Sequence, residues 1–75
     1  MRLTIKETAR LMDSSEDMIR RGLRQGVLPI GVAVAGTGNR FTYYIDHRKV
    51  AAFLRRDPGM VAKVVTVWRG ETDAR

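Results

Sequence analysis

The chain contains no cysteine and a single histidine, which excludes two common ways of stabilising a small protein. Without cysteine there is neither a disulfide framework nor a thiolate metal site. One histidine cannot supply the ligands of a structural zinc finger. We therefore expect no metal and no cofactor, and a fold that depends on its hydrophobic core.

Long apolar runs are also missing. No stretch approaches the about 20 apolar residues that cross a bilayer, and residues 1–15 contain no run typical of a signal peptide. We expect a cytoplasmic protein with no membrane partner. A chain of 75 residues allows one domain with a thin core.

The charge is unbalanced, because 14 Lys and Arg residues face eight Asp and Glu residues, for a net charge of +6. Most of the basic residues are Arg, whose planar fork fits phosphate groups and guanine edges. Such a balance indicates a polyanionic partner, with nucleic acid as the first candidate. The carboxylates show no pairing suited to acid–base catalysis, and no Gly-rich phosphate loop is followed by Lys. We expect a binding protein and not an enzyme.

Two short helices are predicted near the N-terminus. Thr4 and Glu7 fit a capping box that begins the first helix, and Asp13 interrupts its pattern. Ser15 is the expected N-cap of the second helix, with Ser14 as the alternative, and Gly26 is placed to end it. The few residues between the two helices leave room only for a tight turn, which is the spacing of a helix-turn-helix.

Residues 30–44 change to the alternation of β-strands around a turn cluster at residues 36–39, which predicts a β-hairpin. A third helix is expected to begin after the N-cap Asp46 and to stop at Pro58 and Gly59. Phe41 and one of the neighbouring tyrosines are expected to be buried, which argues against stacking on single-stranded nucleic acid. The expected core is Ile5, Ala9, Met12, Ile19, Leu23, Leu28, Val50, Phe53 and Leu54.

Residues 3–21 (LTIKETARLMDSSEDMIRR) and 24–29 (RQGVLP) are similar to the opening of excisionase-type and MerR-like helix-turn-helix domains. Residues 38–44 (GNRFTYY) resemble the wing of the same family. The resemblance covers residues 3–54 and implies a mainly α fold with a small β-hairpin, a winged helix-turn-helix over residues 1–56. Residues 57–75 would form a C-terminal tail that binds a partner or is partly disordered.

That resemblance also implies a function, namely binding of double-stranded DNA. The chain would be an excisionase-like recombination directionality factor, or a small phage or mobile-element transcription regulator. Its protein partner would be an integrase or recombinase, or a second copy of itself. Three positions depart from the family: Asp13 and Ser14 in the turn, and Gly22 inside the second helix, where glycine costs about 1 kcal/mol relative to alanine. These departures predict a loosely packed domain.

In a winged helix the second helix enters the major groove, and the wing lies along the backbone or the minor groove. Arg20 or Arg24 is expected to read guanine, and Arg21 to contact phosphate. The expected DNA-binding residues are Ser15, Glu16, Asp17, Arg20, Arg21, Arg24, Thr37, Asn39, Arg40, Arg48 and Lys49.

Simpler interpretations of these residues stay open. Glu16–Arg20 and Asp17–Arg21 are also i,i+4 pairs of the kind found on any solvated helix, each worth about 0.2–0.5 kcal/mol. The turn cluster can be merely a flexible turn, and His47 is expected to be exposed and non-catalytic.

The segment 60–68 fits a helical stripe and a strand equally well, because four of its apolar residues are β-branched valines. It either folds back on the domain or docks a partner. Docking through this segment gives the alternative function, a protein–protein interaction module of the same fold.

Overall fold

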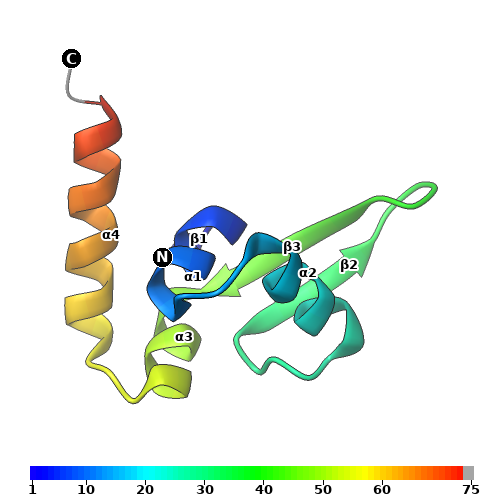
Figure 1. Ribbon diagram of the computed structural model, residues 1–75, viewed down its shortest axis with the longest axis horizontal. Coiled ribbons are helices and arrows are strands. Elements are labelled where there is room, and N and C mark those ends of the chain that lie inside the picture. Colours follow the sequence, from blue (N-terminus) through cyan, green and yellow to red (C-terminus); the bar gives the residue numbers. More distant parts are fainter. Residues whose placement is uncertain (74–75) are drawn as a thin grey trace.

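The computed structural model describes residues 1–73, which form four helices and a three-stranded antiparallel sheet (Figure 1). The elements are β1 (Arg2–Leu3), α1 (Ile5–Met12), α2 (Glu16–Gln25), β2 (Gly31–Ala35), β3 (Phe41–Asp46), α3 (His47–Leu54) and α4 (Pro58–Asp73). The expected mainly helical content and the β2–β3 hairpin are confirmed. The two-stranded sheet was an incomplete prediction, since β1 adds a third strand.

The ends of α1 and α2 lie where local side chains can satisfy the free backbone groups. The Thr4 hydroxyl accepts the Glu7 N–H at 3.0 Å, and the Glu7 carboxylate accepts the Thr4 N–H at 3.0 Å, so the capping box is formed. Asp13 ends α1 in the left-handed conformation (φ 51°), which Asp tolerates better than most residues. Ser15, and not Ser14, caps α2, and Gly26 ends it at φ 71°.

Strand β3 is central in the sheet, with β1 on one side and β2 on the other. Leu3 pairs with Ile45 and Gly31 pairs with the same residue from the opposite side. A Cβ atom at Gly31 would collide with the backbone carbonyl oxygen of Tyr44. Glycine is therefore required where β2 approaches β3.

The chain continues as a helix where the sequence predicted a stop. Helix α3 already ends at Leu54, followed by Arg55 in the left-handed conformation (φ 57°). The Asp57 carboxylate then accepts a backbone N–H of the next turn at 2.9 Å. Pro58 is the first residue of α4, where its missing N–H breaks no helical hydrogen bond. The expectation that Pro58 and Gly59 terminate a helix was wrong, because they open α4.

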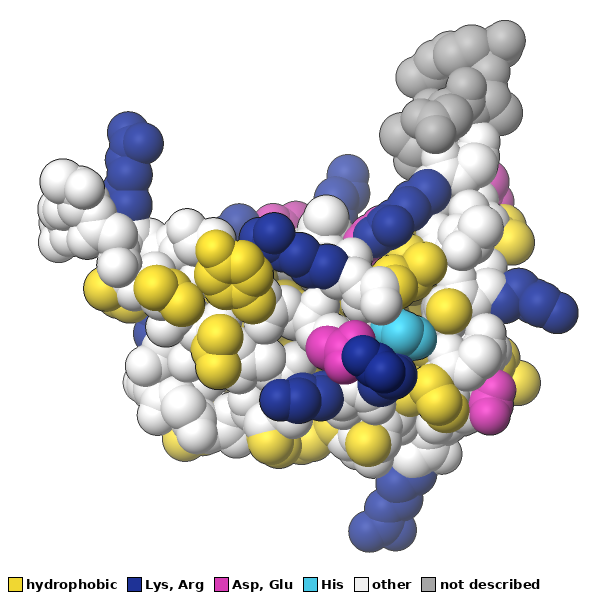
Figure 2. Space-filling model, turned by 180° about the vertical axis from the view of Figure 1, so that it is seen from behind, with side chains coloured by type: hydrophobic (Ala, Val, Ile, Leu, Met, Phe, Trp, Pro, Cys, Tyr) yellow, Lys and Arg dark blue, Asp and Glu magenta, His cyan; other side chains and the backbone are white. Residues whose placement is uncertain are grey.

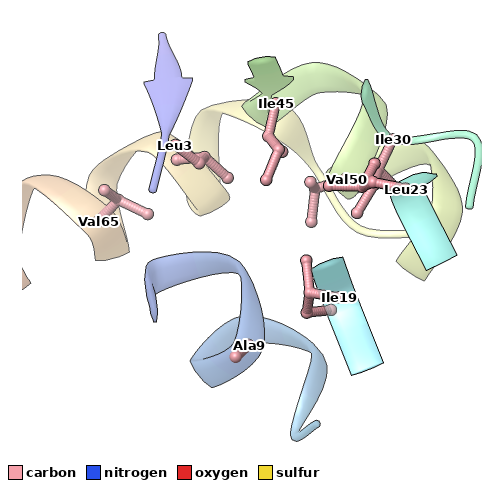
Figure 3. Close-up of a cluster of buried hydrophobic side chains, with 8 residues drawn as sticks. All are labelled: Leu3, Ala9, Ile19, Leu23, Ile30, Ile45, Val50 and Val65. Atoms are coloured by element: carbon pink, nitrogen blue, oxygen red, sulfur yellow. The ribbon is translucent and has the colours of Figure 1, made fainter. Parts of the chain in front are cut away.

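One cluster of buried side chains joins the helices to the sheet (Figure 3). Its members are Leu3, Ala9, Ile19, Leu23, Ile30, Ile45, Val50 and Val65. The prediction that Phe53 belongs to the core was wrong, since it is 45% exposed. Phe53 lies two residues beyond the buried Ala51 and therefore about 200° around the helix from it. Phe41 is also wrong, at 39% exposed, because it begins β3 beside the hairpin turn. Tyr43 packs against the core, whereas Tyr44 is exposed.

Helix α4 folds back on the rest of the molecule. Val61 and Val65 are buried, and Trp68 packs against the core cluster. The strand alternative for residues 60–68 was therefore wrong. No helix in the described part of the chain is long and apolar enough to span a bilayer.

Gly22 has a packing role that the sequence did not indicate. It is buried in α2, and a Cβ atom there would lie 2.5 Å from Cδ1 of Leu28. The missing side chain makes room for the loop after α2 to pack against the helix. Gly22 is thus a point of close contact and not merely an interruption of the helix.

Candidate nucleic-acid interface

Helix α2 presents a charged face because its buried residues all lie on the opposite side. The buried residues are Ile19, Gly22 and Leu23. Since a residue advances about 100° around an α-helix, Asp17, Arg21 and Arg24 fall opposite them, and all three are exposed. The helix therefore carries two outward arginines and one outward carboxylate.

Arg20 lies at the edge of this face and is neutralised by both acids of the first turn. Its guanidinium donates to Glu16 at 3.0 Å and to Asp17 at 3.2 Å. The predicted Glu16–Arg20 pair is confirmed, but the Asp17–Arg21 pair was wrong because Asp17 turns to Arg20 one position earlier. Arg21 makes no hydrogen bond or ion pair with any residue that the structure describes.

Arg24 connects α2 to the hairpin. Its Nη1 donates to the Tyr43 hydroxyl at 3.0 Å, and its guanidinium carbon is 5.8 Å from the centre of the Phe41 ring. Phe41 and Tyr43 are two residues apart, so their rings share one side of β3, with centroids 6.3 Å apart. These contacts orient the Arg24 cation without placing a carboxylate against it.

The predicted tip residues do lie at the hairpin tip, which projects away from the body of the molecule (Figure 1). The Gly36 N–H donates to the Arg40 carbonyl at 2.8 Å, and the Arg40 N–H donates to the Thr37 carbonyl at 3.4 Å. Gly38 adopts φ 69°, which glycine accepts without strain. Thr37, Asn39 and Arg40 are exposed there. Arg40 forms no ion pair with a described residue.

Arg48 and Lys49 are not brought together with the α2 residues. Arg48 donates to Asp46 at 3.2 Å, and Lys49 lines a hollow with Val32 and Tyr44, on the opposite side of β3 from Tyr43. Figure 2 shows apolar side chains gathered on this side of the sheet. The expectation that His47 is exposed was wrong, since its side chain is only 14% exposed, packed beside Asp46.

No match to any family model, curated protein or solved structure was found when the chain was compared with known proteins. The function therefore has to be inferred from the residues and their geometry. Among the side chains that the structure describes, no three His, Asp or Glu residues are grouped so that they could hold a metal ion.

Two basic residues outside the predicted set also contact aromatic rings. The Arg2 guanidinium lies 4.4 Å from the centre of the Tyr44 ring and donates to the Tyr43 carbonyl at 3.2 Å. The Arg10 guanidinium lies 4.1 Å from the centre of the Trp68 ring. Sequence reasoning missed both, because a two-residue strand and a helix–helix contact leave no local pattern.

An ion pair joins α4 to α1. The Arg69 guanidinium donates to both carboxylate oxygens of Glu7, at 2.8 and 3.0 Å, and to the Arg2 carbonyl at 2.8 Å. The hydrogen bonds from Arg69 hold the pKa of Glu7 below its ordinary value, although burial acts in the opposite direction. Glu7 therefore serves both the capping box and the α1–α4 contact.

Proposed function

We propose that this chain binds double-stranded DNA as a winged helix-turn-helix, with α2 in the major groove and the β2–β3 hairpin as the wing. The observation that carries the proposal is the Arg24–Tyr43 contact at 3.0 Å, which joins the arginine face of α2 to the hairpin. One rigid surface of this kind can engage a groove and the adjacent backbone together. The net charge of +6 favours a polyanionic ligand.

Each part of this surface has a chemical task in the proposal. Arg24 reads a guanine edge, for which its fork is suited, and Arg21 contacts a phosphate. Glu16 and Asp17 accept from cytosine amino groups, and by holding Arg20 they reduce their own repulsion of phosphates. The wing contacts the backbone or the minor groove through Thr37, Asn39 and Arg40.

In biological terms, the proposal is an excisionase-like recombination directionality factor or a small phage or mobile-element transcription regulator. Such a protein acts in the cytoplasm and without catalysis of its own. An integrase or a second copy of the chain is the expected protein partner.

A fluorescence anisotropy titration with mixed-sequence duplex DNA at 50 and 200 mM salt tests the proposal. We expect affinity that falls steeply with salt, because bound phosphates release counterions. Arg20→Ala with Arg24→Ala should weaken binding, whereas Arg48→Ala, on the other side of the sheet, should not. Absence of binding at 50 mM salt, or equal affinity for all the variants, would contradict it.

A second candidate function is a protein-interaction module that uses α4. Met60 and Val67 are 57% and 54% exposed and, with Val64, fall on one side of the helix at steps of four and three residues. In that case the protein would self-associate in sedimentation equilibrium. Met60→Lys with Val67→Lys would abolish this association and leave the affinity for duplex DNA unchanged.

A further inference from the structure

A basic hollow lies between α1 and α4, outside the helix and hairpin assigned to DNA reading. It has a volume of about 240 Å³, and its lining residues are Thr4, Lys6, Glu7, Arg10, Trp68 and Arg69. We call it the α1–α4 hollow. Three of its side chains are cations and one is a carboxylate.

The single carboxylate does not neutralise the hollow. Both oxygens of Glu7 are occupied by the Arg69 guanidinium, at 2.8 and 3.0 Å. Lys6 and Arg10 have no acidic partner among the described residues, although they are four apart on α1. Like charges at this spacing repel each other along the helix.

The Arg10 side chain is held in a way that leaves its hydrogen-bond donors available. Its guanidinium lies 4.1 Å from the centre of the Trp68 ring, whose π face attracts the cation. A cation held over a ring keeps N–H donors for other acceptors, such as phosphate oxygens. Arg10 makes no side-chain hydrogen bond within the described part of the chain.

The hollow adjoins the proposed DNA interface. Thr4 lines both the α1–α4 hollow and a neighbouring hollow that Tyr43 also lines, and Tyr43 accepts a hydrogen bond from Arg24. The longest extent of the molecule is 36 Å, about one turn of B-DNA.

We infer that the α1–α4 hollow binds backbone phosphates of the same duplex, through Lys6 and Arg10, at a point that α2 and the hairpin do not reach. The inference rests on the proposed function, because it requires that a duplex be bound. It adds a second anchoring surface at the opposite end of the molecule from the hairpin tip.

The test compares the salt dependence of duplex binding for Lys6→Gln with Arg10→Gln against a matched control, Arg56→Gln with Lys63→Gln. Both variants lose two positive charges, and only the first pair lines the hollow. The hollow variant should bind about tenfold more weakly at 100 mM salt, and the slope of log K against log salt should fall by roughly 1.8, for two lost phosphate contacts. The control should keep the wild-type slope.

Arg10→Lys, which retains the charge, should keep most of the wild-type slope. Far-UV circular dichroism checks that each variant is folded. If the wild type binds and the hollow variant keeps its slope, the inference is overturned and the proposed function stands. If the wild type does not bind duplex DNA at low salt, both fail. Loss of binding to phosphatidylserine vesicles, with duplex binding unchanged, would assign the hollow to a membrane surface and overturn the inference.

Discussion

Arg24 and Arg10 lie against aromatic rings at opposite ends of this molecule, and their surroundings differ. Arg24 donates to the Tyr43 hydroxyl beside the Phe41 ring, whereas Arg10 stacks on Trp68 without a side-chain hydrogen bond among the described residues. Arg20, by contrast, is held by two carboxylates. An aromatic contact orders a cation and leaves its charge available, while a carboxylate orders the cation and cancels its charge.

The contacts that stabilise each end of the molecule also differ in kind. The base of the hairpin depends on steric fit, because Gly31 allows β2 to approach the backbone of β3. At the α4 end, the bidentate contact between Arg69 and Glu7 adds an ion pair to the apolar packing of Val61 and Val65. Changes of side-chain volume should therefore damage the first end, and changes of pH should affect the second.

The largest expected effect is on the steric end. Gly31→Ala should lower the free energy of unfolding by about 3 kcal/mol, because its Cβ atom meets backbone that cannot move aside. Gly70→Ala is the control, since a Cβ atom on this α4 residue meets nothing within 4 Å. It should raise stability by up to about 1 kcal/mol through helix propensity. Urea denaturation measures both, and equal stability of the two variants would contradict the steric argument.

Arg24→Ala tests whether the Arg24 cation, which no carboxylate neutralises among the described residues, contacts DNA. It should weaken binding to a preferred duplex about tenfold, or roughly 1.4 kcal/mol, because a guanine contact is lost. Arg48→Ala removes the same charge on the other side of the sheet and should change affinity far less. Fluorescence anisotropy compares the two, and a larger loss for Arg48→Ala would reverse the assignment of the binding surface.

Tyr43→Phe separates the hydrogen bond of Arg24 from its aromatic contacts. The ring remains beside Phe41, but the acceptor of the 3.0 Å hydrogen bond is lost. We expect a loss of about 1 kcal/mol in stability, the usual value of one such bond. Affinity for duplex DNA should fall about threefold, because Arg24 is then less ordered. Tyr44→Phe serves as the control, and a decrease of the same size there would argue against this role for Tyr43.

The smallest expected effect concerns the charged end. Glu7→Gln keeps a side chain that can complete the capping box but removes the ion pair, which should cost up to about 1 kcal/mol at pH 7. Because the pKa of Glu7 is lowered in the folded state, its stabilisation is present above the ordinary value of 4.5 and disappears as the pH falls through the folded-state pKa.

Urea denaturation at pH 7 and pH 3 measures this difference. Wild type should be the more stable protein at pH 7, and its advantage over Glu7→Gln should be smaller at pH 3. An advantage that is the same at both pH values would exclude the ion pair as its source.

Local signals in the sequence were enough to predict the bounds of α1 and α2. The Thr4–Glu7 capping box, the Ser15 cap and Gly26 depend on neighbours within a few residues, so they can be recognised without the rest of the structure. Strand β1 could not be predicted, because its two residues are defined only by pairing with residues 45–46. Pro58 was misread because the same residue stops one helix or begins another, depending on what precedes it.

The candidate site, too, could be predicted only where it depends on residues close together in the sequence. The face of α2 followed from helical periodicity, but the choice of Asp17 between Arg20 and Arg21 depends on rotamers that spacing does not fix. The Arg24–Tyr43 contact joins residues 19 positions apart and depends on how α2 lies against the sheet. Packing between distant segments also decides the exposure of Phe53.

The most direct test of the central claim is an NMR titration of the arginine side-chain Nε–Hε signals with duplex DNA. The signals of Arg21, Arg24 and Arg40 should shift together and saturate at the same duplex concentration, while those of Arg48 and Arg55 stay in place. Shifts confined to Arg48 and Arg55, with Arg24 unaffected, would show that α2 and the hairpin do not form the DNA-binding surface.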